Sequence, residues 1–75
     1  MKNVQAKKKL IKMSDKWMAR GMNPNFDEDD YLEEMWSVAF KAYPDMKTAE
    51  DSYYVSMSKL SNMVSIAHDD LEETV

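Results

Sequence analysis

The chain has 75 residues, a formal net charge of -4 and no cysteine. A chain of this length forms a single domain with a small core, and the lack of cysteine excludes disulfides and thiolate metal sites. No apolar run approaches the roughly 20 residues of a membrane-spanning helix, and no secretory signal is evident. We therefore expect residues 1–75 to form one cytoplasmic domain.

The composition predicts an all-α fold. One glycine and two prolines stand among many Lys, Glu, Asp, Ala and Met residues, which favour helix. Apolar spacing and helix-terminating residues predict three helices at about 3–20, 27–43 and 45–73. We expect a small three-helix bundle with a long C-terminal helix.

The first predicted helix is basic and amphipathic. Lys8, Lys12, Lys16 and Arg20 recur every fourth residue, with Lys9 beside them, and the opposite side is apolar. We call Lys8, Lys9, Lys12, Lys16 and Arg20 the basic face. The basic face can bind nucleic-acid phosphates, an anionic membrane or an acidic partner. Equally, it can be a solvent-exposed surface that binds nothing. We expect the helix to end at Gly21, the only glycine, in a left-handed conformation.

The stretch Asn23–Glu34 has oxygen-bearing side chains at the spacing of a calcium loop. Glu28 stands where the sharp turn of that loop needs glycine, so the stretch is better explained as a helix start. With Asp27 as N-cap, Phe26 can pack on Tyr31 as a hydrophobic staple. A competing cap is Asn25 with Glu28.

Pro44 ends the second predicted helix, and either Asp45 or Thr48 can cap the third. A seven-residue apolar repeat then continues to residue 73. A helix of about 29 residues would be about 43 Å long, about twice the length of its neighbours. Its uncovered part predicts a homodimer or higher oligomer, whose interface we assign to apolar residues outside the repeat: Tyr54, Val55 and Ile66.

No catalytic or cofactor motif is present. His68 is the only histidine, so it lacks the partners of a zinc site, and no nucleophile accompanies the His-Asp pair. The serines lack a nucleophile elbow. We expect a non-enzymatic protein without metal or cofactor.

Charge is divided unevenly along the chain. Seven basic residues stand against one acid through residue 20, and thirteen acids against three bases after it. The acids at the start of the second helix form a cluster that we call the acidic face: Asp27, Glu28, Asp29, Asp30, Glu33 and Glu34. Such a face can imitate a phosphate backbone and occupy a basic nucleic-acid-binding groove, although acids there also cap the helix and aid solubility.

These features predict a protein-protein interaction module, an inhibitor from a phage or mobile element that acts on a host or defence complex through the acidic face. A nucleic-acid-associated regulatory adaptor that uses the basic face is the first alternative.

The run Ser58–Ala67 resembles the last helix of small phage proteins that sequester cyclic-nucleotide immune signals. The resemblance is carried by this run of ten residues in a chain of 75. It implies a second alternative, a small-ligand sequestering protein, and assigns no binding residue.

Overall fold

A computed structural model describes residues 3–49 and 56–72. Within these ranges the chain forms three α-helices and no strand, which confirms the all-α class: α1 (Val4–Met18), α2 (Glu28–Ala42) and α3 (Met57–Glu72). Two short 3-10 helices, η1 (Arg20–Met22) and η2 (Pro44–Met46), follow α1 and α2.

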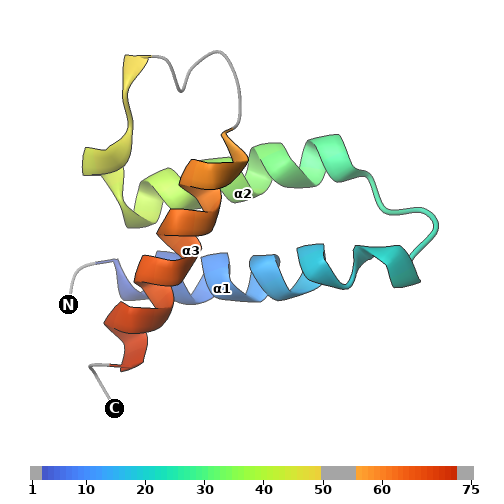
Figure 1. The fold of residues 1–75 in the computed structure, drawn as a ribbon, viewed down its shortest axis with the longest axis horizontal. Coiled ribbons are helices and arrows are strands. Elements are labelled where there is room, and N and C mark those ends of the chain that lie inside the picture. The colour runs from blue at the N-terminus through green and yellow to red at the C-terminus, as the bar shows by residue number, and fades with distance from the viewer. Residues whose placement is uncertain (1–2, 50–55, 73–75) are drawn as a thin grey trace.

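The arrangement is a helical hairpin crossed by a third helix. α1 and α2 run antiparallel, and α3 crosses the N-terminal half of α1 and the C-terminal half of α2 (Figure 1). α3 packs more extensively on α1 than on α2. The end of the hairpin where α1 leads into α2 extends beyond α3 (Figure 1).

α1 ends earlier than expected, at Met18, with Ala19 as its C-cap at φ -92° and ψ 6°. Gly21 does not adopt a left-handed conformation, so that prediction is wrong. The chain instead tightens into η1, where the backbone N–H of Met22 donates to the Ala19 carbonyl at 3.1 Å. A 3-10 turn satisfies the terminal carbonyls without a residue at positive φ.

α2 begins as the sequence predicts. The side chain of Asp27 accepts a hydrogen bond from the backbone N–H of Asp30 at 3.2 Å, and the rings of Phe26 and Tyr31 lie 4.8 Å apart. The N-cap and the hydrophobic staple are therefore both formed. The competing cap at Asn25 is wrong, because α2 starts at Glu28.

The prediction of a long third helix from about residue 45 is wrong. Pro44–Met46 is a 3-10 helix, Lys47 is extended at φ -77° and ψ 130°, and α3 begins only at Met57. The Ser56 hydroxyl accepts from the backbone N–H of Lys59 at 3.3 Å, so Ser56 acts as the N-cap in place of Asp45 or Thr48. At 16 residues, α3 is close in length to α1 and α2, which have 15 each.

The core lies where the three helices cross. Its buried residues come from every helix: Leu10 and Met13 of α1, Met35, Trp36, Val38 and Ala39 of α2, and Leu60, Met63 and Ala67 of α3. Trp36 and Phe40 make an edge-to-face contact with ring centroids 4.6 Å apart. Ala39 of α2 and Ala67 of α3 are both fully buried in this core.

One charged residue is buried beside this core. Lys7 of α1 pairs with Asp70 of α3, and the Tyr43 hydroxyl after α2 donates to the same carboxylate at 2.7 Å. Nearby, the Asn3 side chain donates to the Ala42 carbonyl at 3.3 Å. These contacts hold the start of α1 against the ends of α2 and α3.

Candidate protein-binding surface

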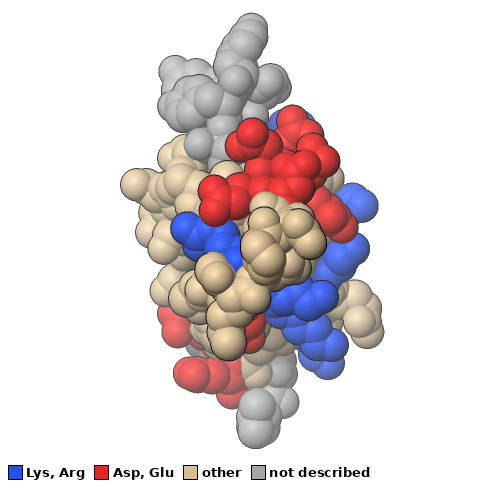
Figure 2. All heavy atoms as spheres, turned by 90° about the vertical axis from the view of Figure 1, so that its right-hand side faces the viewer, with Lys and Arg blue, Asp and Glu red and all other residues tan. Residues whose placement is uncertain are grey.

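The acidic face lies on the first half of α2 and is exposed throughout. Figure 2, which looks at the hairpin end, shows these acids gathered on one side of the molecule and lysines on another. Three of the six acids have structural contacts: Asp27 caps α2, Asp30 lies against the Asp27 carboxylate, and Glu28 accepts from Arg20 Nε at 2.9 Å. Within the described residues, no hydrogen bond or ion pair engages the side chains of Asp29, Glu33 or Glu34.

The charges of the acidic face act on one another. The neighbouring charge of Asp27, and then the hydrogen bond between the two side chains, raise the pKa of the Asp30 carboxyl above its ordinary value of 3.8. Glu33 and Asp29 raise it further. The pKa of Asp30 is raised because its nearest charged neighbours are acids.

The basic face is divided by the structure. Lys8, Lys9, Lys12 and Lys16 are exposed along α1, whereas Arg20 stacks on the Trp17 ring at 4.0 Å, donates to the Trp17 carbonyl at 2.9 Å and pairs with Glu28. Arg20 therefore helps to hold the end of α1 against the start of α2.

Part of the basic face borders the acidic helix. Lys9, Lys12 and Lys16 line a hollow of about 380 Å³ together with Met13, Tyr31 and Glu34. The two charged faces are thus neighbours on antiparallel helices, although only Glu28 and Arg20 form an ion pair between them within the described residues.

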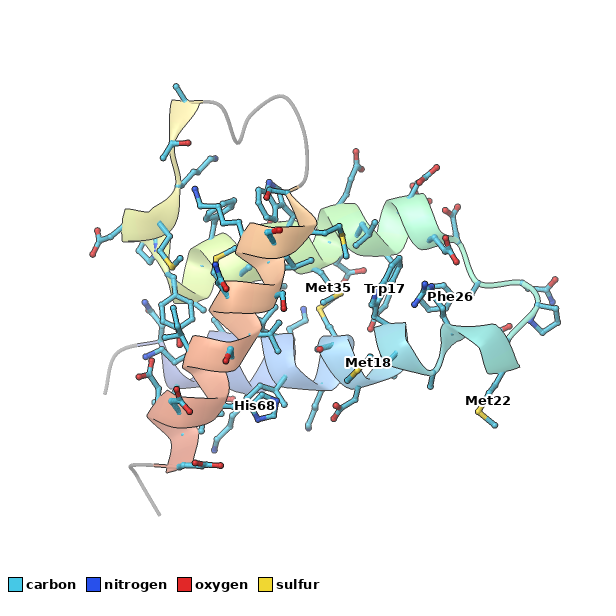
Figure 3. All side chains as sticks on the ribbon, viewed as in Figure 1. Trp17, Met18, Met22, Phe26, Met35 and His68 are labelled. Atoms are coloured by element: carbon cyan, nitrogen blue, oxygen red, sulfur yellow. The ribbon has the colours of Figure 1, made fainter. Side chains whose placement is uncertain are left out.

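An apolar groove, not anticipated from the sequence, opens between the hairpin end and α3. We call it the methionine groove; its volume is about 210 Å³ and its lining is Ser14, Trp17, Met18, Met35, Met57, Leu60, Ser61 and Val64. Trp17 and Met35 point into the space between α1 and α2, and Met18 lies on α1 beside it (Figure 3). The sequence signal was the abundance of methionine, which suits surfaces that repack on partners.

The predicted oligomer interface is only partly within the described residues. Ile66 is 38% exposed on α3, whereas Tyr54 and Val55 lie outside the described ranges. The overhanging long helix that motivated the interface is absent from residues 45–49, because Pro44–Met46 is a 3-10 helix and Lys47 is extended.

The oxygens of the calcium-like spacing have other partners. Asn23 Oδ1 accepts from the backbone N–H of Asn25 at 3.1 Å, and Asp27 caps α2. Within residues 3–49 and 56–72, no three His, Cys, Asp or Glu side chains are grouped so as to hold a metal ion. His68 is exposed on α3. Among the described helices, none has the length and apolarity to cross a membrane.

Comparisons of the chain with protein families, with curated proteins and with solved structures find no match. The class that the fold defines is an all-α protein with three helices in its described residues.

Proposed function

We propose that this chain is a non-enzymatic protein-binding module whose acidic face occupies a basic surface of a partner. The setting we infer is a phage or mobile-element protein that blocks a nucleic-acid-binding groove of a host or defence complex. A rigid acidic helix suits such a groove because its carboxylates present negative charge at fixed spacing, as phosphates do.

The observation that supports this proposal is the surplus of charge on α2. Capping uses Asp27, and the hairpin uses Glu28. Asp29, Glu33 and Glu34 remain exposed, and within the described residues their side chains make no hydrogen bond or ion pair. Glu33 and Glu34 lie beyond the first turn of α2, where the helix dipole no longer favours acids, so local helix stability does not account for them.

The test is affinity capture from the native host with the wild-type chain and with the Glu33→Lys/Glu34→Lys variant. We expect the wild type to retain one stoichiometric protein partner with a basic surface, and the variant to lose it. Neither substitution touches the N-cap, so circular dichroism should show the same helix content in both proteins.

A matched control reverses two exposed acids elsewhere, Asp69→Lys/Glu72→Lys, for an equal change in net charge. This control should keep the partner. Capture that survives reversal of Glu33 and Glu34 would contradict the proposal. Loss of capture on Lys8→Glu/Lys12→Glu instead, with binding to duplex DNA that weakens steeply with salt, would favour the nucleic-acid adaptor.

A further inference from the structure

The hollow between α1 and α2 has cations on one wall and a carboxylate on the other. We call it the lysine hollow; its lining is Lys9, Lys12, Met13 and Lys16 of α1 with Tyr31 and Glu34 of α2. The three lysines follow the spacing of one helix face, and Tyr31 and Glu34 are neighbours three residues apart on α2. None of the lining residues belongs to α3, so the hollow is separate from the methionine groove.

The floor of the lysine hollow is apolar and held in place. Met13 is only 6% exposed and Tyr31 is half-buried, whereas the four charged lining residues are exposed. The Tyr31 ring packs on Phe26, with ring centroids 4.8 Å apart. Because the ring is already ordered by this contact, it can pack against a planar ligand group at little entropic cost.

The cations of the lysine hollow are not used by the fold. Within residues 3–49 and 56–72, the side chains of Lys9, Lys12 and Lys16 make no ion pair or hydrogen bond, whereas Lys7 of the same helix pairs with Asp70. From Lys9 to Lys16 the helix rises about 10 Å, so the three ammonium groups can surround an anion that carries more than one charge. Lysine binds phosphate as a point charge on a flexible stem.

Glu34 distinguishes between classes of anion. Its carboxylate acts on the Tyr31 hydroxyl, since burial and then the charge of Glu34 raise the pKa of Tyr31 above its ordinary value of 10.0. A purely anionic ligand such as inorganic phosphate leaves this carboxylate facing negative charge without a donor. A ligand that also carries amino or hydroxyl groups can donate to it. The hollow, at about 380 Å³, is within the roughly 300–1,000 Å³ of small-molecule sites.

We propose that the lysine hollow binds a nucleotide, with its phosphates on the lysines of α1 and its base on the apolar floor. Glu34 accepts a hydrogen bond from an amino group of the base or a hydroxyl of the sugar. A free nucleotide and a nucleotide within a single strand present this same chemistry, and the test separates the two sources. The inference goes beyond the proposed function and does not depend on it, although Glu34 belongs to both surfaces.

The probes are the ribonucleoside diphosphates of adenine, guanine, cytosine and uracil and a short single-stranded DNA of mixed sequence, each titrated into the full chain with ¹³C-labelled methionine methyls. We expect the methyl signal of Met13 to shift with at least one of them and that of Met22, which is 89% exposed outside the hollow, to stay. A shift with a diphosphate supports a free nucleotide, and a shift with the DNA alone supports a single strand. The nucleoside without phosphate, and pyrophosphate without base, should each bind at least roughly tenfold more weakly.

Variants locate the site. Lys9→Gln/Lys16→Gln should weaken binding of the nucleotide at least roughly tenfold. The matched control Lys41→Gln/Lys47→Gln removes two exposed lysines outside the hollow and should bind as the wild type does.

Three results would overturn the inference: no shift of Met13 with any probe, pyrophosphate binding as tightly as the nucleotide, or equal losses for the two lysine variants. The last two would show only a general attraction of lysines for polyanions. Capture of a protein partner should survive Lys9→Gln/Lys16→Gln, because this variant keeps every carboxylate of the acidic face. Failure of nucleotide binding with capture intact therefore overturns the lysine hollow alone.

Discussion

Lys7 Nζ lies 3.0 Å from Asp70 Oδ2, and this ion pair joins the start of α1 to the end of α3. The Lys7 side chain is 10% exposed and that of Asp70 is 30% exposed. The Tyr43 hydroxyl donates to the same oxygen at 2.7 Å, and Lys7 Nζ lies 5.1 Å from the Tyr43 ring centroid. Since the three residues come from separate elements, the cluster helps to fix the angle at which α3 crosses the hairpin.

Replacing Lys7 should destabilise the fold more than replacing its exposed neighbour. Lys7→Met leaves the Asp70 carboxylate without its cation and removes the contact over Tyr43. Lys8→Met alters a solvated side chain and should change the free energy of unfolding by less than roughly 0.5 kcal/mol. Urea unfolding followed by circular dichroism measures both. In an Asp70→Asn background the effect of Lys7→Met should shrink; an undiminished effect would show that the ion pair does not stabilise the fold.

Acid should remove the contribution of Asp70. The hydrogen bond from Tyr43, followed by that from Lys7, lowers the pKa of the Asp70 carboxyl below its ordinary 3.8. The folded state therefore binds this proton less readily than the unfolded chain does. The resulting stability is fully present above about pH 4 and is lost as the pH falls through the folded-state pKa.

The measurement is the difference in urea midpoint between the wild type and Asp70→Asn. It should be largest near neutral pH and should decrease below about pH 4. The difference is more informative than the wild-type profile, because the raised pKa of Asp30 contributes with the opposite sign. A difference that stays constant with pH would contradict the ionic role of Asp70.

The N-cap of α2 can be tested against the alternative cap. Asp27→Ala removes the acceptor for the Asp30 backbone N–H and should cost about 1 kcal/mol of stability. Asn25→Ala should cost less, since the hydrogen bond at this position comes from the Asn25 backbone N–H to Asn23 Oδ1. Equal losses for the two variants in thermal unfolding would argue against Asp27 as the cap.

The N-cap of α3 can be tested in the same way, by comparing Ser56→Ala with Ser58→Ala. Ser56→Ala should cost about 1 kcal/mol, because the Ser56 hydroxyl accepts from the Lys59 backbone N–H. Ser58→Ala replaces an exposed serine within the helix and should be neutral or slightly stabilising, since alanine has the higher helix propensity. A larger loss from Ser58→Ala than from Ser56→Ala would contradict the observed helix start.

Truncation of a core methionine should destabilise the fold, whereas truncation of a surface methionine should not. Met63 is fully buried between α3 and the hairpin, and Met63→Ala should cost about 2–5 kcal/mol. Since a core of this size supplies only about 3–5 kcal/mol in total, the variant should lose most of its helix signal at 25 °C. Met22→Ala should fold normally; a folded Met63→Ala would show that the core is less tightly packed than described.

The sequence by itself determined the elements whose causes are local. Phe26, Asp27 and Tyr31 lie within six consecutive residues, so their staple and cap could be predicted without any tertiary contact. The separation of basic α1 from acidic α2 was likewise readable from residue order. Thr48 and Ser56 are both competent caps, however, and local propensity gave no means to choose between them.

Tertiary structure decided the start of α3, the burial of Lys7 and the methionine groove. The α3 residues that pack against the hairpin in the core are Leu60, Met63 and Ala67, and all three follow Ser56. In the sequence, Lys7 is not distinguished from the lysines that follow it. Only the folded structure brings Asp70 beside it. The groove is lined by residues of all three helices, so no periodicity within one helix could reveal it; it forms only when α3 packs across the hairpin.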